Sequence, residues 1–264
     1  MLADSTNVER PGYNPSERTV GTGLDGLFAK ANNSRIIVAT FASNIHRLQQ
    51  IVNAAQKFER KVAVSGRSMV NVMAVARDLG YIDIDDDMLI DLNDIHKYED
   101  NELVIITTGS QGEPMSALAR MASAEHKKVE IRQGDLVIIS AHPIPGNEKL
   151  ISKVVNCLFE KGAEVVYDDA ADIHVSGHAR QEELKLMHRL VAPKFFMPAH
   201  GEFRMLKKHA EIAEDLGMPS QNIFVMKTGE VLELDKTSAK VASHIPTGNV
   251  LVDGLGVGDV GNIV

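Results

Sequence analysis

The sequence predicts an α/β fold in which a mostly parallel β-sheet is covered by helices on both faces. From residue 34 onward, short β-branched runs alternate with amphipathic stretches whose apolar residues recur at helical spacing. Loops of small residues separate the two kinds of segment. Strands that alternate with helices form right-handed βαβ units, which place the strands in parallel beneath the helices.

The predicted strands are apolar and each leads into a polar loop. They lie within residues 35–41, 61–66, 103–114, 135–147, 163–168 and 194–202. Ligands of such sheets bind beyond the carboxyl ends of the strands. The loops there are rich in Ser, Thr, Asn, Gly and His, and they open onto helix N-termini, which favour phosphate groups. The sequence therefore predicts an anion-binding rim at one edge of the sheet.

Helices are predicted at 45–58, 69–80, 115–124 and 148–162, with a further helical run starting near Arg180. Gly80 is a predicted helix stop, Pro114 suits a first helical turn and Asn147 is a predicted N-cap. Residues 222–226, 228–234 and 249–254 are predicted to be short strands of a β-rich layer. The opening LADSTN is predicted to be the end of a strand, and the abrupt start suggests a piece of a longer protein.

The composition is that of a soluble globular protein. The chain has 264 residues, of which 44% are hydrophobic and 24% charged, enough for one large or two modest domains. No apolar run approaches the roughly 20 residues of a membrane span, and no signal region is visible. Cys157 is the single cysteine, which excludes an internal disulfide and a cysteine zinc cluster. We therefore expect a cytoplasmic protein without membrane partners.

The charge is unevenly distributed. The net charge is −8, and residues 83–102 carry nine acids against the single base Lys97. A basic cluster follows, formed by Arg180, Lys185, Arg189, Lys194, Arg204, Lys207 and Lys208. Both are consistent with solvated surface, and the basic cluster is equally consistent with contact to an RNA backbone.

Several polar residues could carry chemistry. His200 follows an apolar run, where it could ligate a metal or simply form a structural hydrogen bond. Asp4 is a strand-end carboxylate that could act in a site or close a turn. The stretch 168–183 is consistent with a phosphate nest with His178 as a general acid, with a metal site of Asp172, His174 and His178, or with a capped polar loop. Asp168 and Asp169, at the start of this stretch, provide further carboxylates.

A serine hydrolase is a further alternative. Ser110 lies between a strand and a helix, and Asp172 and His178 follow it in the chain order of an α/β-hydrolase triad. Thr108 replaces the first glycine of the G-x-S-x-G motif, which counts against this interpretation.

Taken together, several blocks resemble the ribonuclease J family of the β-CASP branch of metallo-β-lactamase proteins. They are ADSTN, ATFASNIHRLQQ, TTGSQGEPM, PIPGN, DIHVSGHARQEE, KFFMPAHGEFRM and GDVGNIV. The resemblance implies a β-CASP domain at 19–173 between metallo-β-lactamase segments at 1–18 and 174–264, part of an αββα layer. It also implies RNA hydrolysis, internally and from the 5′ end, in the processing and decay of rRNA and mRNA.

The resemblance also implies roles for individual residues. His178 would protonate the leaving oxygen, Asp4 would hold the His178 ring in place, and His200 would contact a catalytic metal. The RNA 5′-monophosphate would be gripped by Ser43, Asn44, His174, Val175, Ser176, Gly177 and His178. Two divalent ions are implied, zinc first, with manganese or magnesium as alternatives, and the whole protein would be a homo-oligomer.

The sequence departs from the family pattern at its main metal motif. H-x-H-x-D-H does not occur in the 264 residues. We therefore expect the full protein to be a nuclease and this chain alone to be inactive. An RNA- or 5′-phosphate-binding module without catalysis is the alternative.

Overall fold

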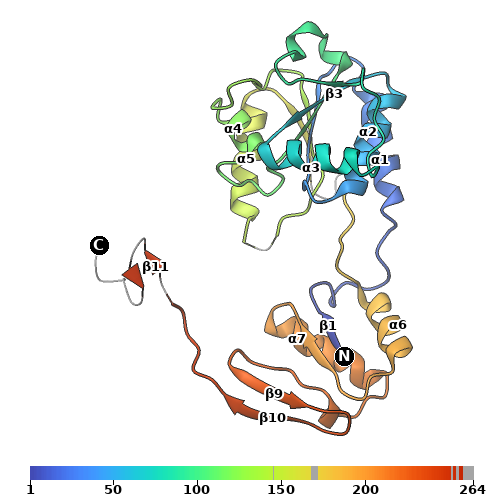
Figure 1. Cartoon of the computed structure of the whole chain (residues 1–264), viewed down its shortest axis with the longest axis vertical. Coiled ribbons are helices and arrows are strands. Elements are labelled where there is room, and N and C mark those ends of the chain that lie inside the picture. Colours follow the sequence, from blue (N-terminus) through green and yellow to red (C-terminus); the bar gives the residue numbers. More distant parts are fainter. Residues whose placement is uncertain (145, 168–171, 251, 254–255, 258–264) are drawn as a thin grey trace. The chain divides into compact units, whose positions relative to one another are not determined.

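The computed structural model describes residues 1–144, 146–167, 172–250, 252–253 and 256–257 (Figure 1). The chain divides into two compact units. Unit 1 comprises residues 1–14 and 177–264, and unit 2 comprises residues 15–176. The sequence predicts these boundaries at 18/19 and 173/174, whereas the chain passes between the two units at 14/15 and 176/177.

Unit 2 is built on a six-stranded sheet in which every pair of neighbours is parallel. The strand order is β4-β3-β5-β2-β6-β7. The strands are β2 (Ile36–Ala39), β3 (Lys61–Ser65), β4 (Leu89–Ile90), β5 (Leu103–Thr107), β6 (Leu136–Ile139) and β7 (Glu164–Val166). The predicted parallel α/β architecture is confirmed.

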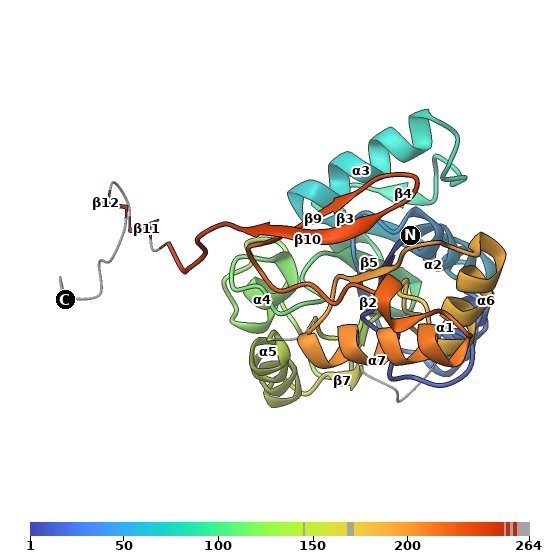
Figure 2. The same ribbon diagram turned by 90° about the horizontal axis from the view of Figure 1, so that it is seen from below.

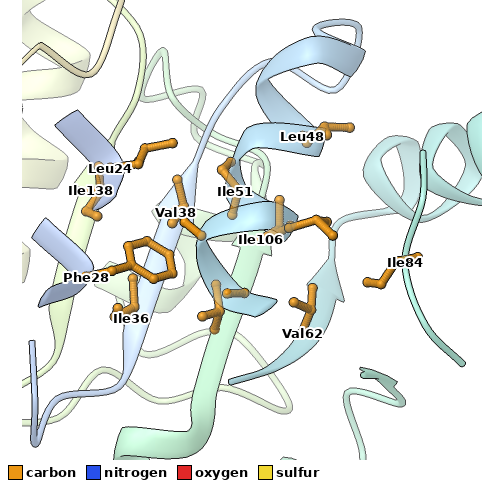
Figure 3. Packing of buried hydrophobic residues seen from close by; sticks show 14 of the residues in the cluster. Leu24, Phe28, Ile36, Val38, Leu48, Ile51, Val62, Ile84, Ile106 and Ile138 are labelled. Atoms are coloured by element: carbon orange, nitrogen blue, oxygen red, sulfur yellow. The ribbon is translucent and has the colours of Figure 1, made fainter. Parts of the chain in front are cut away.

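Helices cover both faces of this sheet, because alternate strand residues point to opposite sides. Ile36 and Val38 of β2 belong to the core shared with α1 (Arg18–Lys30), α2 (Ile45–Lys57) and α3 (Arg67–Asp78) (Figure 3). Ile37 and Ala39 belong to the core shared with α4 (Ala117–Ala122) and α5 (Glu148–Glu160). Each fully buried aliphatic side chain stabilises the fold by about 1.5–3 kcal/mol, which is why these strands are almost entirely apolar.

The predicted helices are present, with two corrections at their starts. Pro114 does not lie in the first turn of α4, because Ser116 caps the helix by accepting a hydrogen bond from the amide of Ala119. Asn147 occupies the N-cap position of α5 but makes no capping bond, and its Nδ2 donates to Oε1 of Gln111 at 3.4 Å. Gly80 has φ 73° just beyond α3, as expected of a helix stop.

The helix α1 was not predicted, because its sequence contains three glycines that disfavour a helix. Its buried residues Val20, Leu24 and Phe28 are spaced by four and pack against the sheet. Burial of this apolar stripe therefore outweighs weak local propensity.

The acidic segment 83–102 lies at the surface of unit 2 and includes β4 and two 3₁₀ turns, η1 (Ile95–Lys97) and η2 (Asp100–Glu102). Several of its carboxylates pair with bases: Asp86 with Arg77, Asp87 with Lys61, Asp94 with Lys97 and Asp100 with Arg132. Asp86 and Asp87 are more than four-fifths exposed. This segment is the solvated surface that its composition indicates.

Unit 1 contains a parallel pair formed by β1 (Leu2–Asp4) and β8 (Met197–Ala199), with Asp4 opposite Ala199. The strand predicted within 194–202 is therefore real, but it pairs with β1 and not with the six-stranded sheet. The helices α6 (Gln181–Val191) and α7 (Phe203–Asp215) belong to the same unit.

The C-terminal part is β-rich, as predicted, but its strands differ from the prediction. β9 (Glu230–Leu234) and β10 (Ala239–His244) form an antiparallel hairpin (Figure 2), of which only β9 was predicted. Residues 222–226 are not a strand: the turn η4 (Ser220–Asn222) is followed by a single bridge between Phe196 and Ile223. β11 (Val252–Asp253) pairs with β12 (Gly256–Val257), and the rest of the predicted strand at 249–254 lies partly outside the described residues.

Over the part of the chain that the structure describes, none of the helices combines the length and the apolar character needed to cross a membrane.

Candidate metal and RNA site

Asp4, His178 and His200 form a cluster within unit 1. Asp4 ends β1, His200 follows β8, and His178 precedes α6. One potential ligand atom from each lies within 4.8 Å of the others. The parallel register, which sets Asp4 beside Ala199, brings the ends of the two strands together and so places the carboxylate next to His200.

A turn fixes the carboxylate of Asp4. Its Oδ1 accepts a hydrogen bond from the amide of Thr6 at 2.9 Å, so the turn-closing role considered from the sequence is real. Burial raises the pKa of Asp4, but the Thr6 amide, the hydrogen bond from His200 and the positive potential of His178 outweigh it. The net effect is a pKa below the ordinary 3.8. Asp4 is therefore an anion, and it can only accept hydrogen bonds.

Both imidazoles share one carboxylate oxygen. Nδ1 of His178 lies 3.1 Å from Oδ2 of Asp4, and Nδ1 of His200 forms a short hydrogen bond to the same atom. The two rings stack at 5.3 Å with an interplanar angle of 22°. Because Asp4 is an acceptor, each neutral ring carries its proton on Nδ1 and leaves the lone pair of Nε2 for another partner.

Hydrogen bonds to their backbone carbonyls hold the two histidines in place. The carbonyl of His178 accepts from Nδ2 of Asn7 at 3.0 Å and from Nδ2 of Asn14 at 2.8 Å. The carbonyl of His200 accepts from the amide of Ser5 at 3.2 Å and from Oγ1 of Thr6 at 3.1 Å. His200 has φ 51°, a left-handed conformation that costs energy for a non-glycine residue and is typical of functional sites.

Thr6, Asn7 and Asn14 were not predicted as site residues, although their hydroxyl and amide side chains follow Asp4 in the sequence. Asn14 also donates to Oε2 of Glu183 at 2.7 Å, and that carboxylate accepts from the amide of Arg180 at the start of α6. Contacts over more than 160 residues of sequence have no local pattern that would reveal them.

The cluster suits a divalent metal in part. Zinc takes imidazole nitrogens and carboxylate oxygens at about 2.0–2.2 Å, so atoms up to about 4 Å apart can share one ion. Asp4 binds Nδ1 of His200 and so orients the ring, while Nε2 does not contact Asp4. A metal-ligating histidine usually has this arrangement. Oδ2 of Asp4 is occupied by two imidazoles, so its geometry favours orientation of the rings over ligation.

Three of the seven residues in the predicted basic cluster pair with neighbouring acids. Arg204 pairs with Glu9 and Glu202, Lys185 with Glu182, and Lys208 with Glu211. Contact of this surface with an RNA backbone stays a prediction.

The residues predicted to grip phosphate lie mainly on unit 2. Ser43 is exposed in the loop after β2, and Asn44 caps α2 by accepting from the amide of Arg47 at 3.1 Å. His174 contacts His142 edge-on, with ring centroids 4.5 Å apart. His142 follows β6, the neighbour of β2, so it belongs to the same edge of the sheet. It was not predicted from the sequence.

Val175, Ser176 and Gly177 are the other residues of this stretch that were predicted to bind phosphate. Val175 packs against the core, so it offers a ligand only its backbone. Ser176 is half-buried at the end of unit 2, and Gly177, which is exposed, begins unit 1.

The alternative metal site of Asp172, His174 and His178 finds no support among the described residues, where the metal-type cluster that contains His178 is completed by Asp4 and His200. The segment around Gly177 is not helical, as a histidine pair at 174 and 178 would require. Asp168 and Asp169 lie outside the described residues.

The serine-hydrolase triad also fails. Ser110 is 2% exposed, and the carboxylate that holds His178 is Asp4, not Asp172. The hydroxyl is therefore closed to substrate, and its proposed base is engaged elsewhere.

Comparison with known families defines the class of this protein. Residues 33–158 match the model of the ribonuclease J β-CASP domain, and residues 163–226 match that of the Zn-dependent metallo-hydrolase RNA specificity domain. The chain therefore combines a β-CASP domain with a metallo-hydrolase RNA specificity domain.

Relatives extend the match over the whole chain. It is 49% identical to Ribonuclease J2 of Bacillus subtilis over 100% of its length, and 48% identical to Ribonuclease J of Synechocystis over 97%. Ribonuclease J of Helicobacter pylori is 48% identical over 96% of this chain. The chain belongs to the ribonuclease J family. It spans 47%, 40% and 37% of these three relatives, less than half of each.

Proposed function

We propose that the protein containing this chain hydrolyses RNA phosphodiester bonds by a metal-dependent reaction, internally and from a 5′-monophosphorylated end. The observation that carries the proposal is the sharing of Asp4 Oδ2 by His178 and His200, which directs both Nε2 atoms away from the carboxylate. Membership of the ribonuclease J family supports RNA as the substrate.

Each residue has a distinct part in this proposal. Nε2 of His200 ligates a divalent metal, zinc first, with manganese or magnesium as alternatives, in a site that holds two such ions. Bound metal would polarise the phosphoryl group and activate water. His178, once protonated, donates the proton of Nε2 to the leaving oxygen, and Asp4 holds the ring and stabilises its charge.

The test uses the full polypeptide that contains this chain and a 5′-monophosphorylated RNA. Chelator should abolish hydrolysis, and His178→Ala should lower kcat by about 10²–10⁴-fold. The matched control is His96→Ala, since His96 is an exposed histidine of unit 2. Hydrolysis that survives chelation, or full activity of His178→Ala, would contradict the proposal.

The 264 residues alone are proposed to bind RNA without cutting it, because the H-x-H-x-D-H motif is absent from them. One imidazole from His200 is too small a ligand set for a catalytic zinc, which takes three protein ligands. Chelator-sensitive cleavage by the isolated chain would refute this part.

The 5′-monophosphate is proposed to bind at the edge of unit 2 that carries Ser43, Asn44 and residues 174–176. Ser43→Ala and Ser176→Ala should weaken binding of 5′-monophosphorylated RNA relative to RNA with a 5′-hydroxyl, at fixed salt. Ser152→Ala, an exposed serine on α5, is the control and should leave the ratio unchanged. Equal binding of both RNAs by the unmodified chain would contradict a 5′-monophosphate site at this edge.

Homo-oligomer formation and a cytoplasmic location are further proposals for the whole protein. Sedimentation of the full polypeptide and cell fractionation test them.

A further inference from the structure

Arg47 is a charged residue in the interior of unit 2. It lies in the first turn of α2, and its side chain is 0% exposed. Nε and Nη2 donate to the two carboxylate oxygens of Glu17 at 2.7 and 3.0 Å. Nη1 donates to Ser140 Oγ at 2.7 Å, to the Ser140 carbonyl at 3.0 Å and to the Ile173 carbonyl at 3.0 Å. A buried charge persists only when paired and hydrogen-bonded in this way.

The partners of Arg47 belong to the two places where the chain passes between the units. Glu17 comes just after the first crossing at 14/15, and Ile173 just before the second at 176/177. Ser140 strengthens the link, because its hydroxyl donates to the Ile173 carbonyl at 2.6 Å. One side chain thus ties the entering and the leaving segment to the carboxyl end of β6.

The same residue connects to the proposed phosphate-binding edge. The amide of Arg47 donates to Asn44 Oδ1, which fixes the loop containing Ser43. The Ile173 carbonyl is next in the chain to His174, whose ring contacts His142. The loops after β2 and β6 and the segment 174–176 therefore meet around Arg47.

We propose that Arg47 is a positioning residue for recognition of the RNA 5′-monophosphate. It does not touch the phosphate, because it is buried and its charge is matched by Glu17. It acts by holding residues 174–176 against the loop of Ser43 and Asn44. The proposal rests on the phosphate site proposed above.

A lysine cannot replace Arg47 in this arrangement. It keeps the positive charge, but its ammonium cannot reach the Glu17 carboxylate in two places and both carbonyls at once. Arg47→Lys therefore loosens the segment while preserving net charge. Arg35→Lys is the matched control. Arg35 is equally buried, pairs with Asp135 in two hydrogen bonds, and lies at the amino end of β2, the opposite edge of the sheet.

The experiment measures, for the 264-residue chain at fixed salt, the ratio of dissociation constants for RNA with a 5′-hydroxyl and with a 5′-monophosphate. Arg47→Lys should reduce this ratio by about tenfold, and Arg35→Lys should leave it unchanged. General loss of stability lowers both affinities together and does not move the ratio. Circular dichroism at the assay temperature establishes that each variant is folded.

Ser140→Ala, which removes only the hydroxyl, is the second variant and decides the question if Arg47→Lys does not fold. It should reduce the ratio in the same direction by a smaller factor. A wild-type ratio retained by the folded Arg47→Lys chain, or by Ser140→Ala alone if Arg47→Lys is unfolded, would overturn the role of Arg47. A wild-type chain that does not distinguish the two RNAs would overturn the phosphate site itself.

Discussion

Asp4 ends β1 and His200 directly follows its parallel neighbour β8, and Oδ2 of the carboxylate accepts a hydrogen bond from Nδ1 of the imidazole. His178 donates to the same oxygen, so one carboxylate sets the tautomer of two rings. In the neutral rings the proton is thereby held on Nδ1, and both Nε2 atoms stay unprotonated.

We predict that Asp4→Asn removes this control. An amide presents one acceptor oxygen and two N–H donors, so it cannot accept from both rings with the strength of a carboxylate. Nitrogen-15 NMR at about pH 8, where histidine is ordinarily neutral, should show the Nδ1–H tautomer for His178 and His200 in the wild type. In Asp4→Asn at least one ring should shift towards Nε2–H.

The same substitution should weaken zinc binding by the full polypeptide about 10–100-fold. Asp94→Asn, which alters a surface pair with Lys97 in unit 2, is the control and should have no effect. Unchanged tautomers together with unchanged affinity would show that Asp4 does not orient the rings.

Two glycines of α1 should respond oppositely to alanine. A Cβ on Gly23 would overlap the backbone carbonyl of Asp172, whereas a Cβ on Gly26 meets nothing within 4 Å. Alanine is favoured over glycine in a helix by about 1 kcal/mol. Gly26→Ala should therefore stabilise unit 2 by about 0.5–1 kcal/mol, and Gly23→Ala should destabilise it by about 1–3 kcal/mol, as overpacking does.

Urea unfolding of both variants measures this difference. The Asp172 backbone precedes Ile173, which Arg47 holds, so the close approach at Gly23 is part of the same link. A stabilising Gly23→Ala would mean that the segment near Asp172 moves away from α1 at little cost.

The sheet could be predicted from the sequence because its strands are buried on both faces, which makes runs such as Ile36–Ala39 continuously apolar. α1 could not, since its helix depends on packing of Leu24 and Phe28 against distant strands. β10 was missed for the opposite reason: five of its six residues are exposed, so burial imposes no continuous apolar run on its sequence.

The candidate site divides in the same way. Asp4, His178 and His200 were found because each lies in a polar stretch of the sequence, and all three match family motifs. Their supporting contacts from Asn7 and Asn14 were not found, because no local spacing links residues so far apart in the chain. The interior role of Arg47 was hidden within an amphipathic helix, where an arginine normally indicates the solvent face.

Ser110→Ala should leave RNA hydrolysis by the full polypeptide within about twofold of wild type, since a change of one buried hydroxyl does not reach the Asp4 cluster. Ser110 is 2% exposed and cannot attack a substrate as placed. Steady-state kcat and KM on a 5′-monophosphorylated RNA are the measurement. A loss of more than about 10²-fold in kcat would restore the serine as a nucleophile.

The stability of unit 1 should fall on mild acidification because of His209. This residue of α7 is 2% exposed, its Nδ1 lies 2.9 Å from Ser5 Oγ, and its ring contacts Phe196 edge-on at 4.8 Å. Burial, with the nearby His188, lowers the pKa of His209 from 6.5 to about 4, although Asp4 opposes this shift. The folded state therefore holds a neutral ring at neutral pH.

The direction of this pH dependence follows from the difference in proton binding between the unfolded and the folded chain. Between pH 6.5 and about 4 the unfolded chain binds a proton at His209 that the folded chain does not, so the free energy of unfolding decreases as pH falls. The contribution of His209 to the free energy of unfolding is complete above pH 6.5, and about 3 kcal/mol of it is lost by pH 4, at 1.36 kcal/mol per unit of pKa.

NMR of the His209 ring should give a titration midpoint below pH 5. His209→Asn keeps an acceptor for Ser5 but cannot titrate, so its unfolding free energy in urea should depend less steeply on pH. An identical slope in wild type and variant would assign the acid sensitivity to other groups, His188 first, whose pKa is also lowered by burial.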